Sequence, residues 1–453
     1  MKPEQAGQAQ LQASGFLERT FRLTENNTNV RTEFIGALTT WIASVGYIIL
    51  IYPAVLSNVG VPKEGVFLSA IIATLIGTLC MAFTANYPFI MGPGAAHAAF
   101  FTFTVCIGMN IPWQIALGMV FIEGVIFIII SVLPIREAIL NCIPMGLKNA
   151  ISVGIGFFIA FIGMNTTGII VGNEATLVAI GDLTSPAVII SLLALLIMVV
   201  LHSLKIQGAL LLGIVGATIV GALPWFNVTS YQGIVSLPPV AEWLQIAFQL
   251  DIVGALKLSY IPVIFAFLFV DIFDTAGTLV GASAKAGFLD EKGNLPRAGQ
   301  AFLSDAIGTT AGALMGSSTV TTYLESAVGV VSGARTGLTA LFFALFMAGC
   351  IFFSPLVMTI PAAATFAALI MLGALMMSSI TKINWDDFTE VFPAFVVVMG
   401  MPLTYSISNG IGLGFISYAA GKLFTGRGKE VHWLVYILAG LFVIYFAFLG
   451  VRV

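Results

Sequence analysis

Charged residues are scarce in this chain of 453 residues. Only 9% of them are charged and 59% are hydrophobic, and many uncharged runs reach about 17–25 residues, the length of a membrane-spanning helix. That much apolar surface excludes a water-soluble globular fold. The uncharged runs are continuous, whereas a membrane β-barrel shows alternating segments of about ten residues. The composition therefore predicts an all-α polytopic protein of the lipid bilayer.

Histidine, cysteine and net charge are low as well. The chain has three histidines and four cysteines, and its net charge is −3. The cysteines lie in or beside apolar runs without paired or metal-site spacing, so we interpret them as packing residues without disulfides: Cys80, Cys106, Cys142 and Cys350. These counts provide no nucleophile–base pair and no metal ligand set, which argues against an enzyme and a bound cofactor. The charge offers no basic field for a nucleic acid.

Basic residues indicate the orientation in the membrane. The polar stretch MKPEQAGQAQLQASG lacks the apolar core of a signal peptide, so we expect it to be retained. Basic residues precede the first predicted span and then fall on alternate loops, at Arg19, Arg22, Arg31, Arg136, Lys148, Lys205, Lys285, Lys292, Arg297, Arg335 and Lys382. The positive-inside rule then predicts a cytoplasmic segment 1–33 and a multi-pass protein of the plasma (cell inner) membrane. Lys422, Arg427 and Lys429 do not fit this alternation of cytoplasmic basic loops if 391–424 crosses the membrane once.

The apolar runs fall into two sets. The first set is 34–58, 65–84, 88–108, 113–133, 148–170, 184–203 and 207–224, and the second is 256–284, 299–316, 320–334, 338–358, 361–379, 391–424 and 433–450. The third run of each set is interrupted near its start, by MGPGAAHAAFF and by MGSSTVTTYLES. Interrupted spans in corresponding positions indicate an inverted repeat with a binding site between the breaks. We predict about fourteen spans in a seven-plus-seven inverted repeat, with broken third and tenth spans.

Buried charge divides these spans into two bodies. Spans one to four and eight to eleven, in residues 34–145 and 252–358, carry the membrane-embedded acids, and we expect them to form a core domain. The remaining spans, in residues 146–251 and 359–453, carry almost no buried charge and are expected to form a gate domain. The run 391–424 is too long for one simple crossing, and its centre, MPLTYSISNG, predicts a bend between two short legs.

Three carboxyl groups at bilayer depth are the most informative feature. Asp271 and Asp274 lie one helical turn apart in FAFLFVDIFDTAGTLVGAS, and Thr275 and Thr278 extend the same face. Glu325, in STVTTYLESAVG, is the third acid. A carboxylate at this depth costs about 2.5–3.5 kcal/mol, and burial disfavours its charged form, so each is a candidate proton carrier. This pattern predicts a transporter, although a structural carboxylate bonded to a neighbouring helix is the alternative for each acid.

The two interrupted spans offer a binding site. The Gly92-Pro93-Gly94 break leaves helix amides free at its C-terminal side, and Gly316-Ser317-Ser318 predicts extended backbone before a second helix start. Helix N-termini carry partial positive charge and favour an electron-rich ligand edge. Glu325 can accept hydrogen bonds from ring N–H groups, and Tyr323 offers a ring and a hydroxyl. The predicted substrate-binding residues are Asp274, Glu325, Tyr323, Thr322, Ala95, Ala96 and His97; for His97 a satisfied core histidine is the alternative.

The other acids have either an undecided role or a structural one. Glu123 lies alone among apolar residues, and a packing role and a proton-relay role remain equally open. Asp305 lies near a predicted span start and is interpreted as a helix cap. Asp386 and Asp387 follow Asn384 and are interpreted as solvated acids at a helix start.

Several strings resemble the purine permeases of the AzgA-like branch of the nucleobase–cation symporter-2 family. They are RTEFIGALTTWIASVGYI, GDLTSPAV, GIVSLPP, FFSPL, INWDDFTEVFPAF and the long block that starts at DIFDTAGTLVG. The resemblance covers essentially the whole chain. It implies about fourteen spans in core and gate domains, proton-driven uptake of a nucleobase and a homodimer through the gate. It matches Asp274 and Glu325 to the family's substrate-site acids, Asp271 to a companion acid and Tyr323 to an aromatic beside the base.

The chain also departs from the family pattern. The family usually reads PGMGLNAFF in span three, whereas this chain has His97 at the leucine and Ala98 at the asparagine; in span one, Tyr52-Pro53-Ala54 replaces Asn-Pro-Gln. A site built for hydrogen bonds discriminates strongly, so this change predicts, as an alternative, a carrier of the same fold for a different small heterocycle or anion. A channel needs a continuous polar pore, and an accessory protein has little reason for three buried acids.

Overall fold

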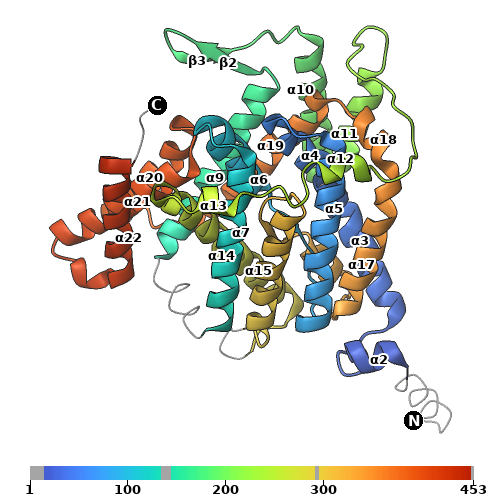
Figure 1. Ribbon diagram of the computed structural model, residues 1–453, viewed down its shortest axis with the longest axis horizontal. Coiled ribbons are helices and arrows are strands. Elements are labelled where there is room, and N and C mark those ends of the chain that lie inside the picture. The colour runs from blue at the N-terminus through green and yellow to red at the C-terminus, as the bar shows by residue number, and fades with distance from the viewer. Residues whose placement is uncertain (1–14, 134–143, 291–294, 450–453) are drawn as a thin grey trace.

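Long apolar helices make up most of the chain. A computed structural model describes residues 15–133, 144–290 and 295–449 (Figure 1). Within these ranges eight helices have the length and the apolar composition needed to cross a membrane, and shorter apolar helices such as Ala95–Gly108 and Phe388–Leu403 accompany them. The chain is therefore a mostly helical polytopic membrane protein, as its composition predicts. Arg136, Cys142 and Lys292, which the sequence interpretation used, lie outside the described residues.

The first part of the chain consists mainly of helices, with three short strands and the loops that connect them. Its helices are α2 (Phe16–Phe21), α3 (Val30–Gly46), α4 (Tyr52–Leu56), α5 (Lys63–Cys80), α6 (Ala95–Ala99), α7 (Trp113–Val132), α9 (Met145–Thr166), α10 (Pro186–Ser203), α11 (Ala209–Gly221) and α12 (Val240–Leu244). The π-helical turn η1 (Tyr47–Ile51) joins α3 to α4, and η4 (Phe100–Gly108) continues α6. The strands are β1 (Met91–Pro93), β2 (Ile170–Asn173) and β3 (Leu177–Ile180).

The second part repeats this alternation of long helices with one short strand. Its helices are α13 (Ile252–Ala255), α14 (Ile261–Ala286), α15 (Ala298–Leu314), α16 (Ser326–Val331), α17 (Gly337–Cys350), α18 (Ser354–Thr359), α19 (Ala362–Met376), α20 (Phe388–Leu403), α21 (Ile407–Phe424) and α22 (Trp433–Ile444), with the 3-10 turn η8 (Gly428–Glu430) before the last of them. The strand β4 (Val320–Thr322) lies between α15 and α16, just as β1 lies between α5 and α6.

Strands β1 and β4 bring the two interrupted segments of the sequence together. They pair antiparallel with the register Met91↔Thr322, Gly92↔Thr321 and Pro93↔Val320. Helices α5 and α15 pack beside them through glycines: a Cβ atom at Gly308 would lie 3.2 Å from the Cα of Gly77 and 3.0 Å from Val320 Cγ1. The absent side chains let the two helix backbones approach each other and the strand closely.

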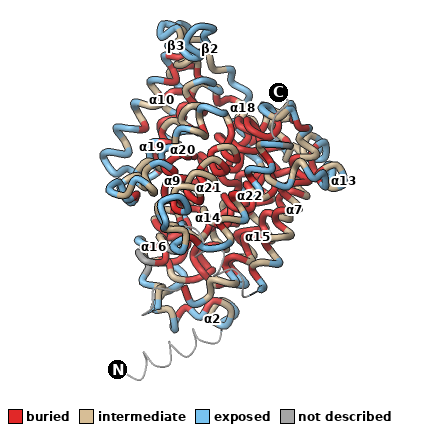
Figure 2. The backbone as a smooth tube through the Cα atoms, turned by 90° about the vertical axis from the view of Figure 1, so that its left-hand side faces the viewer, coloured by how far each residue is buried: buried red, intermediate tan, exposed pale blue. Residues whose placement is uncertain are grey.

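Helix packing joins segments that lie far apart in the sequence. Helix α15 packs on α5 and α7, and α17 packs on α3, all within 34–145 and 252–358. Helix α9 packs on α19 and α20, and α10 packs on α11 and α19, all within the other ranges. Buried residues run through the middle of the molecule and exposed ones lie toward its periphery (Figure 2). Peripheral helices such as α10 expose apolar side chains, which a bilayer would cover: Leu192, Leu196, Val199 and Val200.

Helices α20 and α21 form an antiparallel hairpin. The two short legs expected around MPLTYSISNG are present, but they pack along each other instead of continuing one bent crossing. Lys422, near the end of α21, forms an ion pair with Asp387, at the start of α20, over 3.4 Å. The two ends therefore lie on the same face of the protein. The two legs are therefore separate helices, the alternative of a fifteenth span, and the return removes the conflict that Lys422 and Arg427 posed for the charge pattern.

Candidate functional site

The candidate site is built on the β1–β4 pair. Beyond the strand ends, Gly94 N donates to Thr319 O at 3.0 Å and Tyr323 N donates to Ile90 O at 3.0 Å. The hydroxyl of Tyr323 donates to the carbonyl of Pro93 at 2.6 Å. All residues of both strands are buried, so these bonds supply the partners that an extended backbone needs inside a membrane protein.

The helix start at α6 lies directly after β1. Gly94 is extended, and the first helical hydrogen bond runs from Ala98 N to Gly94 O at 2.9 Å. The amides of Ala95, Ala96 and His97 therefore precede the helical bonding pattern, as the sequence predicts. Gly94 cannot carry a side chain, because a Cβ atom there would collide with the imidazole of His97 and with Thr321.

The second helix start differs from the prediction. The segment from Ser317 to Thr322 is extended, but its amides are occupied: Ser318 N donates to the hydroxyl of Tyr52 at 2.7 Å, and Val320 N donates to Thr309 Oγ1 at 3.1 Å. The helix begins only at Ser326, so Glu325 is its N-cap residue and not a residue one turn inside a span. The amides of Ser318 and Val320 are therefore not free for a ligand, because the hydroxyls of Tyr52 and Thr309 accept their hydrogens.

Asp274 and Glu325 are the acids nearest to solvent in this region. Both are half-buried, whereas Asp271 is fully buried, and the two carboxyls interact electrostatically. The hydroxyl of Thr321 lies 3.5 Å from Asp274 Oδ2 and thereby connects α14 to β4. The pair can bind a polar ligand edge or a proton without first unfolding its surroundings.

Two tyrosine rings lie beside these acids. Tyr47 and Tyr323 make an edge-to-face contact with 5.8 Å between ring centroids, and both interact electrostatically with Glu325. The Tyr323 hydroxyl already donates its hydrogen to Pro93, so only its ring and the acceptor side of its oxygen remain for a ligand. The Tyr47 hydroxyl is buried without a hydrogen-bond partner among the described residues. Sequence reasoning missed Tyr47, although a phenol within the apolar string IASVGYIIL was a signal for it.

Further polar atoms near the strands lack partners. Both ring nitrogens of His97 and the hydroxyl of Thr322 are buried and form no hydrogen bond within the described chain. His97 is therefore not the satisfied core histidine of the alternative interpretation. A buried polar atom left unpaired costs about 1–3 kcal/mol, so these groups favour a ligand that would pair with them.

Tyr52 has a structural role. Its hydroxyl lies 3.0 Å from Ser317 Oγ and accepts the amide hydrogen of Ser318. It therefore fixes the extended segment that leads into β4. The departure at Tyr52 from the family pattern supports the scaffold and is not available as a free ligand contact.

Asp271, on α14, meets two further acids that come from α7 and α15. Asp271 lies within hydrogen-bonding reach of both Glu123 and Asp305, and all three are fully buried. Two interpretations are thereby corrected: Glu123 is not alone, and Asp305 lies in the middle of α15, too far from its start to cap it. No group of His, Cys, Asp or Glu side chains in the described ranges is arranged as a metal site.

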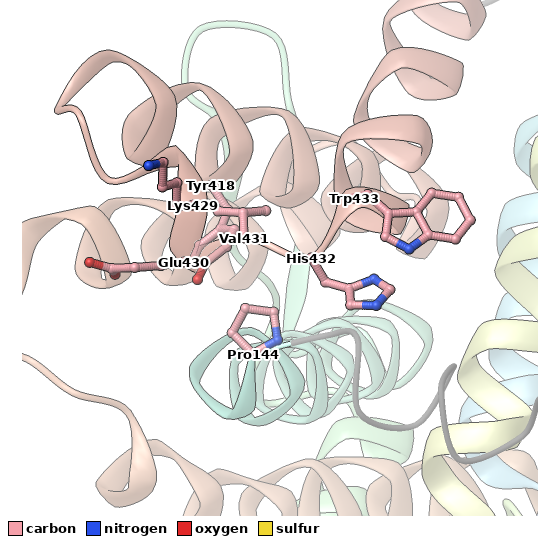
Figure 3. A pocket seen from close by; sticks show the side chains of 7 residues that line it. All are labelled: Pro144, Tyr418, Lys429, Glu430, Val431, His432 and Trp433. Carbon is pink, nitrogen blue, oxygen red and sulfur yellow. The ribbon is translucent and has the colours of Figure 1, made fainter.

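A surface pocket and an ion-pair network lie elsewhere, at the end of the α20–α21 hairpin. The pocket has a volume of about 560 Å³ and is lined by residues such as Tyr418, His432 and Trp433, none of which belongs to the predicted site (Figure 3). Beside it, Arg427 contacts Asp387 at 2.6 Å. The hydroxyl of Thr389 and the guanidinium of Arg427 hold the pKa of the Asp387 carboxyl well below its usual range.

The fold and the site define a class of protein. Many apolar helices surround buried acids, paired strand segments and unpartnered polar atoms, which is the arrangement of a multi-pass membrane transporter. Residues 31–413 match the sequence model described as the permease family. The chain belongs to this family, the nucleobase–cation symporter-2 family.

Its relatives are similar over nearly their whole length. The guanine/hypoxanthine permease PbuO of Bacillus subtilis is 44% identical over 94% of this chain and 99% of its own. The adenine permease AdeP of Escherichia coli is 39% identical over 97% of this chain and 98% of its own.

A solved structure shares the fold. The transmembrane domain of the bicarbonate transporter BicA of a cyanobacterium superposes with a TM-score of 0.65, at 15% identity, over 85% of this chain and 97% of that domain. At this level of identity the likeness concerns the fold alone.

Proposed function

We propose that this permease is a secondary active symporter that imports a nucleobase, in particular a purine, together with protons by alternating access. The observation that carries the proposal is the pair of half-buried acids Asp274 and Glu325, set among buried polar atoms without partners. A heterocycle with ring N–H donors and ring-nitrogen acceptors can satisfy such a site. The relatives named as adenine and guanine/hypoxanthine permeases support a purine.

The proposed mechanism assigns the groups of the site to substrate binding and to proton coupling. Glu325 and Asp274 accept hydrogen bonds from the base, and the ring of Tyr323 packs on its face. The amides of Ala95, Ala96 and His97, together with the hydroxyl of Thr322, bind its acceptor edge. One of Asp271, Asp274 and Glu325 takes the coupling proton, which lowers the cost of moving the loaded core past the apolar gate.

The division into moving parts is also a proposal. It assigns 34–145 and 252–358 to the core, and 146–251 and 359–453 to the gate, within a seven-plus-seven inverted repeat. The packing of helices within these ranges and the similarity to BicA support it. We further propose a cytoplasmic N-terminus, residence in the cell inner membrane and a homodimer through the gate.

The test is uptake of labelled adenine, guanine, hypoxanthine and uracil by cells that lack their own nucleobase permeases, with and without a protonophore. We expect uptake of a purine that the protonophore abolishes. Asp274→Asn and Glu325→Gln each remove an ionic acceptor, which weakens binding by about 10–100-fold and reduces uptake accordingly. Asp386→Asn, at an exposed acid, is the control. Normal uptake by Asp274→Asn or Glu325→Gln, with the protein in the membrane, would exclude that residue from the mechanism.

A second candidate function is transport of a different small heterocycle or anion by the same fold. The unpartnered imidazole of His97, beside Ala98 where the family carries an amide, favours it. If this wall selects the ligand, the double variant His97→Leu with Ala98→Asn shifts the preference toward ordinary purines. Competition by unlabelled bases against uptake measures this, and an unchanged order of competitors would count against the second function.

A further inference from the structure

The carboxyls of Glu123, Asp271 and Asp305 form a buried cluster that the proposed substrate contacts do not use. They come from three helices, and none has any exposed surface. Asp271 lies between the other two, within hydrogen-bonding reach of each. An ionised carboxylate only accepts hydrogen bonds, so carboxyls in contact need a proton between them.

The surroundings of this carboxyl cluster offer no other source of positive charge. Within the described ranges no lysine, arginine or histidine forms an ion pair with any of the three acids. One oxygen of each carboxyl, namely Glu123 Oε1, Asp271 Oδ1 and Asp305 Oδ1, is buried and receives no hydrogen bond from a hydroxyl or an amide there. These three atoms are unpartnered unless a proton joins them. Since the groups are not arranged as metal ligands either, the chemistry selects a proton.

The remaining neighbours of the cluster are threonine hydroxyls and one more acid. Thr309 Oγ1 lies 3.3 Å from Asp271 Oδ2, and Thr319 Oγ1 lies 3.5 Å from Glu123 Oε2. Asp274 is the further titratable group that acts on Asp271 and Asp305. A proton bound in the cluster therefore responds to the charge of Asp274, where the substrate is proposed to bind.

Two hydroxyls connect the cluster with Asp274. Thr275 Oγ1 donates to Asp305 Oδ2 at 2.6 Å and lies 2.9 Å from Thr321 Oγ1. Thr321 Oγ1 in turn lies 3.5 Å from Asp274 Oδ2. A hydroxyl both donates and accepts, so this pair can pass a proton between the substrate-facing acid and the buried cluster.

We propose that the Glu123–Asp271–Asp305 cluster binds the coupling proton, and that Thr321 and Thr275 carry it between Asp274 and Asp305. A proton that arrives at Asp274 moves along the two hydroxyls and converts a carboxylate of the cluster to a carboxyl; its release restores the negative charge. This inference rests on the proposed function and adds Glu123 and Asp305, as proton-binding residues, to it.

The test separates substrate exchange from proton coupling in proteoliposomes with labelled hypoxanthine and adenine. Counterflow at equal pH needs no net proton movement, whereas net uptake driven by an imposed pH gradient does. Glu123→Gln and Asp305→Asn imitate a permanently protonated side chain. We expect both to retain measurable counterflow, while the ratio of uptake with and without the gradient falls to about one, because substrate and proton binding are no longer coupled. Glu64→Gln, a carboxyl in the first turn of α5, is the matched control and keeps the wild-type ratio.

Each other outcome is decisive. A wild-type gradient ratio in Glu123→Gln and in Asp305→Asn overturns the cluster as the proton site. If Asp305→Asn does not fold, the two variants of Glu123 still test the proposal. We expect Glu123→Gln to lose the gradient response and the acid-retaining Glu123→Asp to restore it. Counterflow without any gradient response in the wild-type protein overturns proton coupling itself, which distinguishes failure of the proposed function from failure of this inference.

Discussion

Glu33 shows how a buried carboxylate of this chain can be purely structural. It is fully buried in α3 and accepts the amides of Arg335 at 2.9 Å and Thr336 at 3.2 Å. It also accepts the hydroxyls of Thr28 at 2.7 Å and Thr339 at 2.6 Å. Unlike the three acids on α7, α14 and α15, it has a full set of donors. Its carboxylate caps the start of α17 and thereby ties two helices of the proposed core together.

We expect Glu33→Ala to destabilise the protein without a specific effect on substrate preference. The change leaves the Arg335 and Thr336 amides and the Thr28 hydroxyl without their acceptor, while Thr339 keeps the main-chain oxygen of residue 33 at 3.1 Å. Each donor that stays buried and unpaired costs about 1–3 kcal/mol. The melting temperature of the detergent-solubilised protein measures this loss. Glu18→Ala is the control, since Glu18 accepts the amide of Thr24 at an exposed site. Equal melting temperatures of the two variants would contradict the capping role.

The sequence indicates which residues contribute polar groups to the site better than it indicates which of these residues contact each other. Asp274, Glu325 and His97 were predicted from their context, and the structure places them around one pair of strands. The partnership of Asp305 with Asp271 was missed because it depends on how α15 packs on α14. The sequence did contain a signal for this contact. Asp305 and Thr309 are four residues apart and share one face of α15, and a polar face of this kind is not needed by a helix cap.

At the scale of elements, the α20–α21 hairpin depends on charges at its ends. Lys422 is nearly fully buried and contacts Asp387, Glu390 and Glu430 within 3.4 Å. Arg427 joins Asp387 and Glu430 as well. The cations therefore hold the end of α21 against the start of α20. Hydropathy alone could not reveal this return, because both legs are equally apolar.

We expect Asp387→Asn to lower the melting temperature at neutral pH and to lose this effect in acid. The folded protein holds the pKa of Asp387 below its ordinary value of about 3.9, so the carboxylate stabilises the fold above that value. As the pH falls below that value, the unfolded chain takes up this proton first, so the stabilisation shrinks; it is lost completely only when the folded carboxyl also protonates, at its lowered pKa. Melting curves of wild type, Asp387→Asn and the exposed control Asp386→Asn from pH 7 to pH 3 test this. A difference that is constant over that range would contradict it.

The short strands were the least predictable elements. Breaks at Gly92-Pro93-Gly94 and after Gly316 are visible in the sequence, but a run of three residues carries no usable periodicity. Only tertiary structure decides that β1 pairs with β4. The same holds for the β2–β3 hairpin, which the sequence interpretation assigned to a loop region and which lies at the opposite end of the molecule from α2 (Figure 1).

At the scale of the whole molecule, aromatic rings line the contact between the two proposed bodies. Phe265 and Phe269 lie one turn apart on α14 and contact Phe442 on α22 and Phe415 on α21, with 6.3 Å and 5.4 Å between ring centroids. Lys148 Nζ, on α9, lies 5.1 Å from the ring centroid of Phe273, which is also on α14. Apolar rings have few directional bonds, so this contact is suited to sliding.

We expect a cross-link across this contact to stop transport reversibly. The double variant Phe269→Cys with Phe415→Cys, in a background without the native cysteines, places two thiols on α14 and α21. A short bifunctional thiol reagent then abolishes uptake, and a reductant restores it, because the core can no longer move against the gate. Each single variant treated in the same way is the control. Full uptake by the cross-linked protein would show that these two helices do not move relative to each other.

The β1–β4 pair has a consequence for how substitutions beside it act. Its hydrogen bonds are made almost wholly by main-chain atoms, which every residue except proline provides in the same way. Side chains around it, such as those at 97 and 98, can therefore change without loss of the framework that positions them. Substitutions at these two positions are therefore expected to change the lining of the proposed site and to leave the path of the chain through the membrane unchanged.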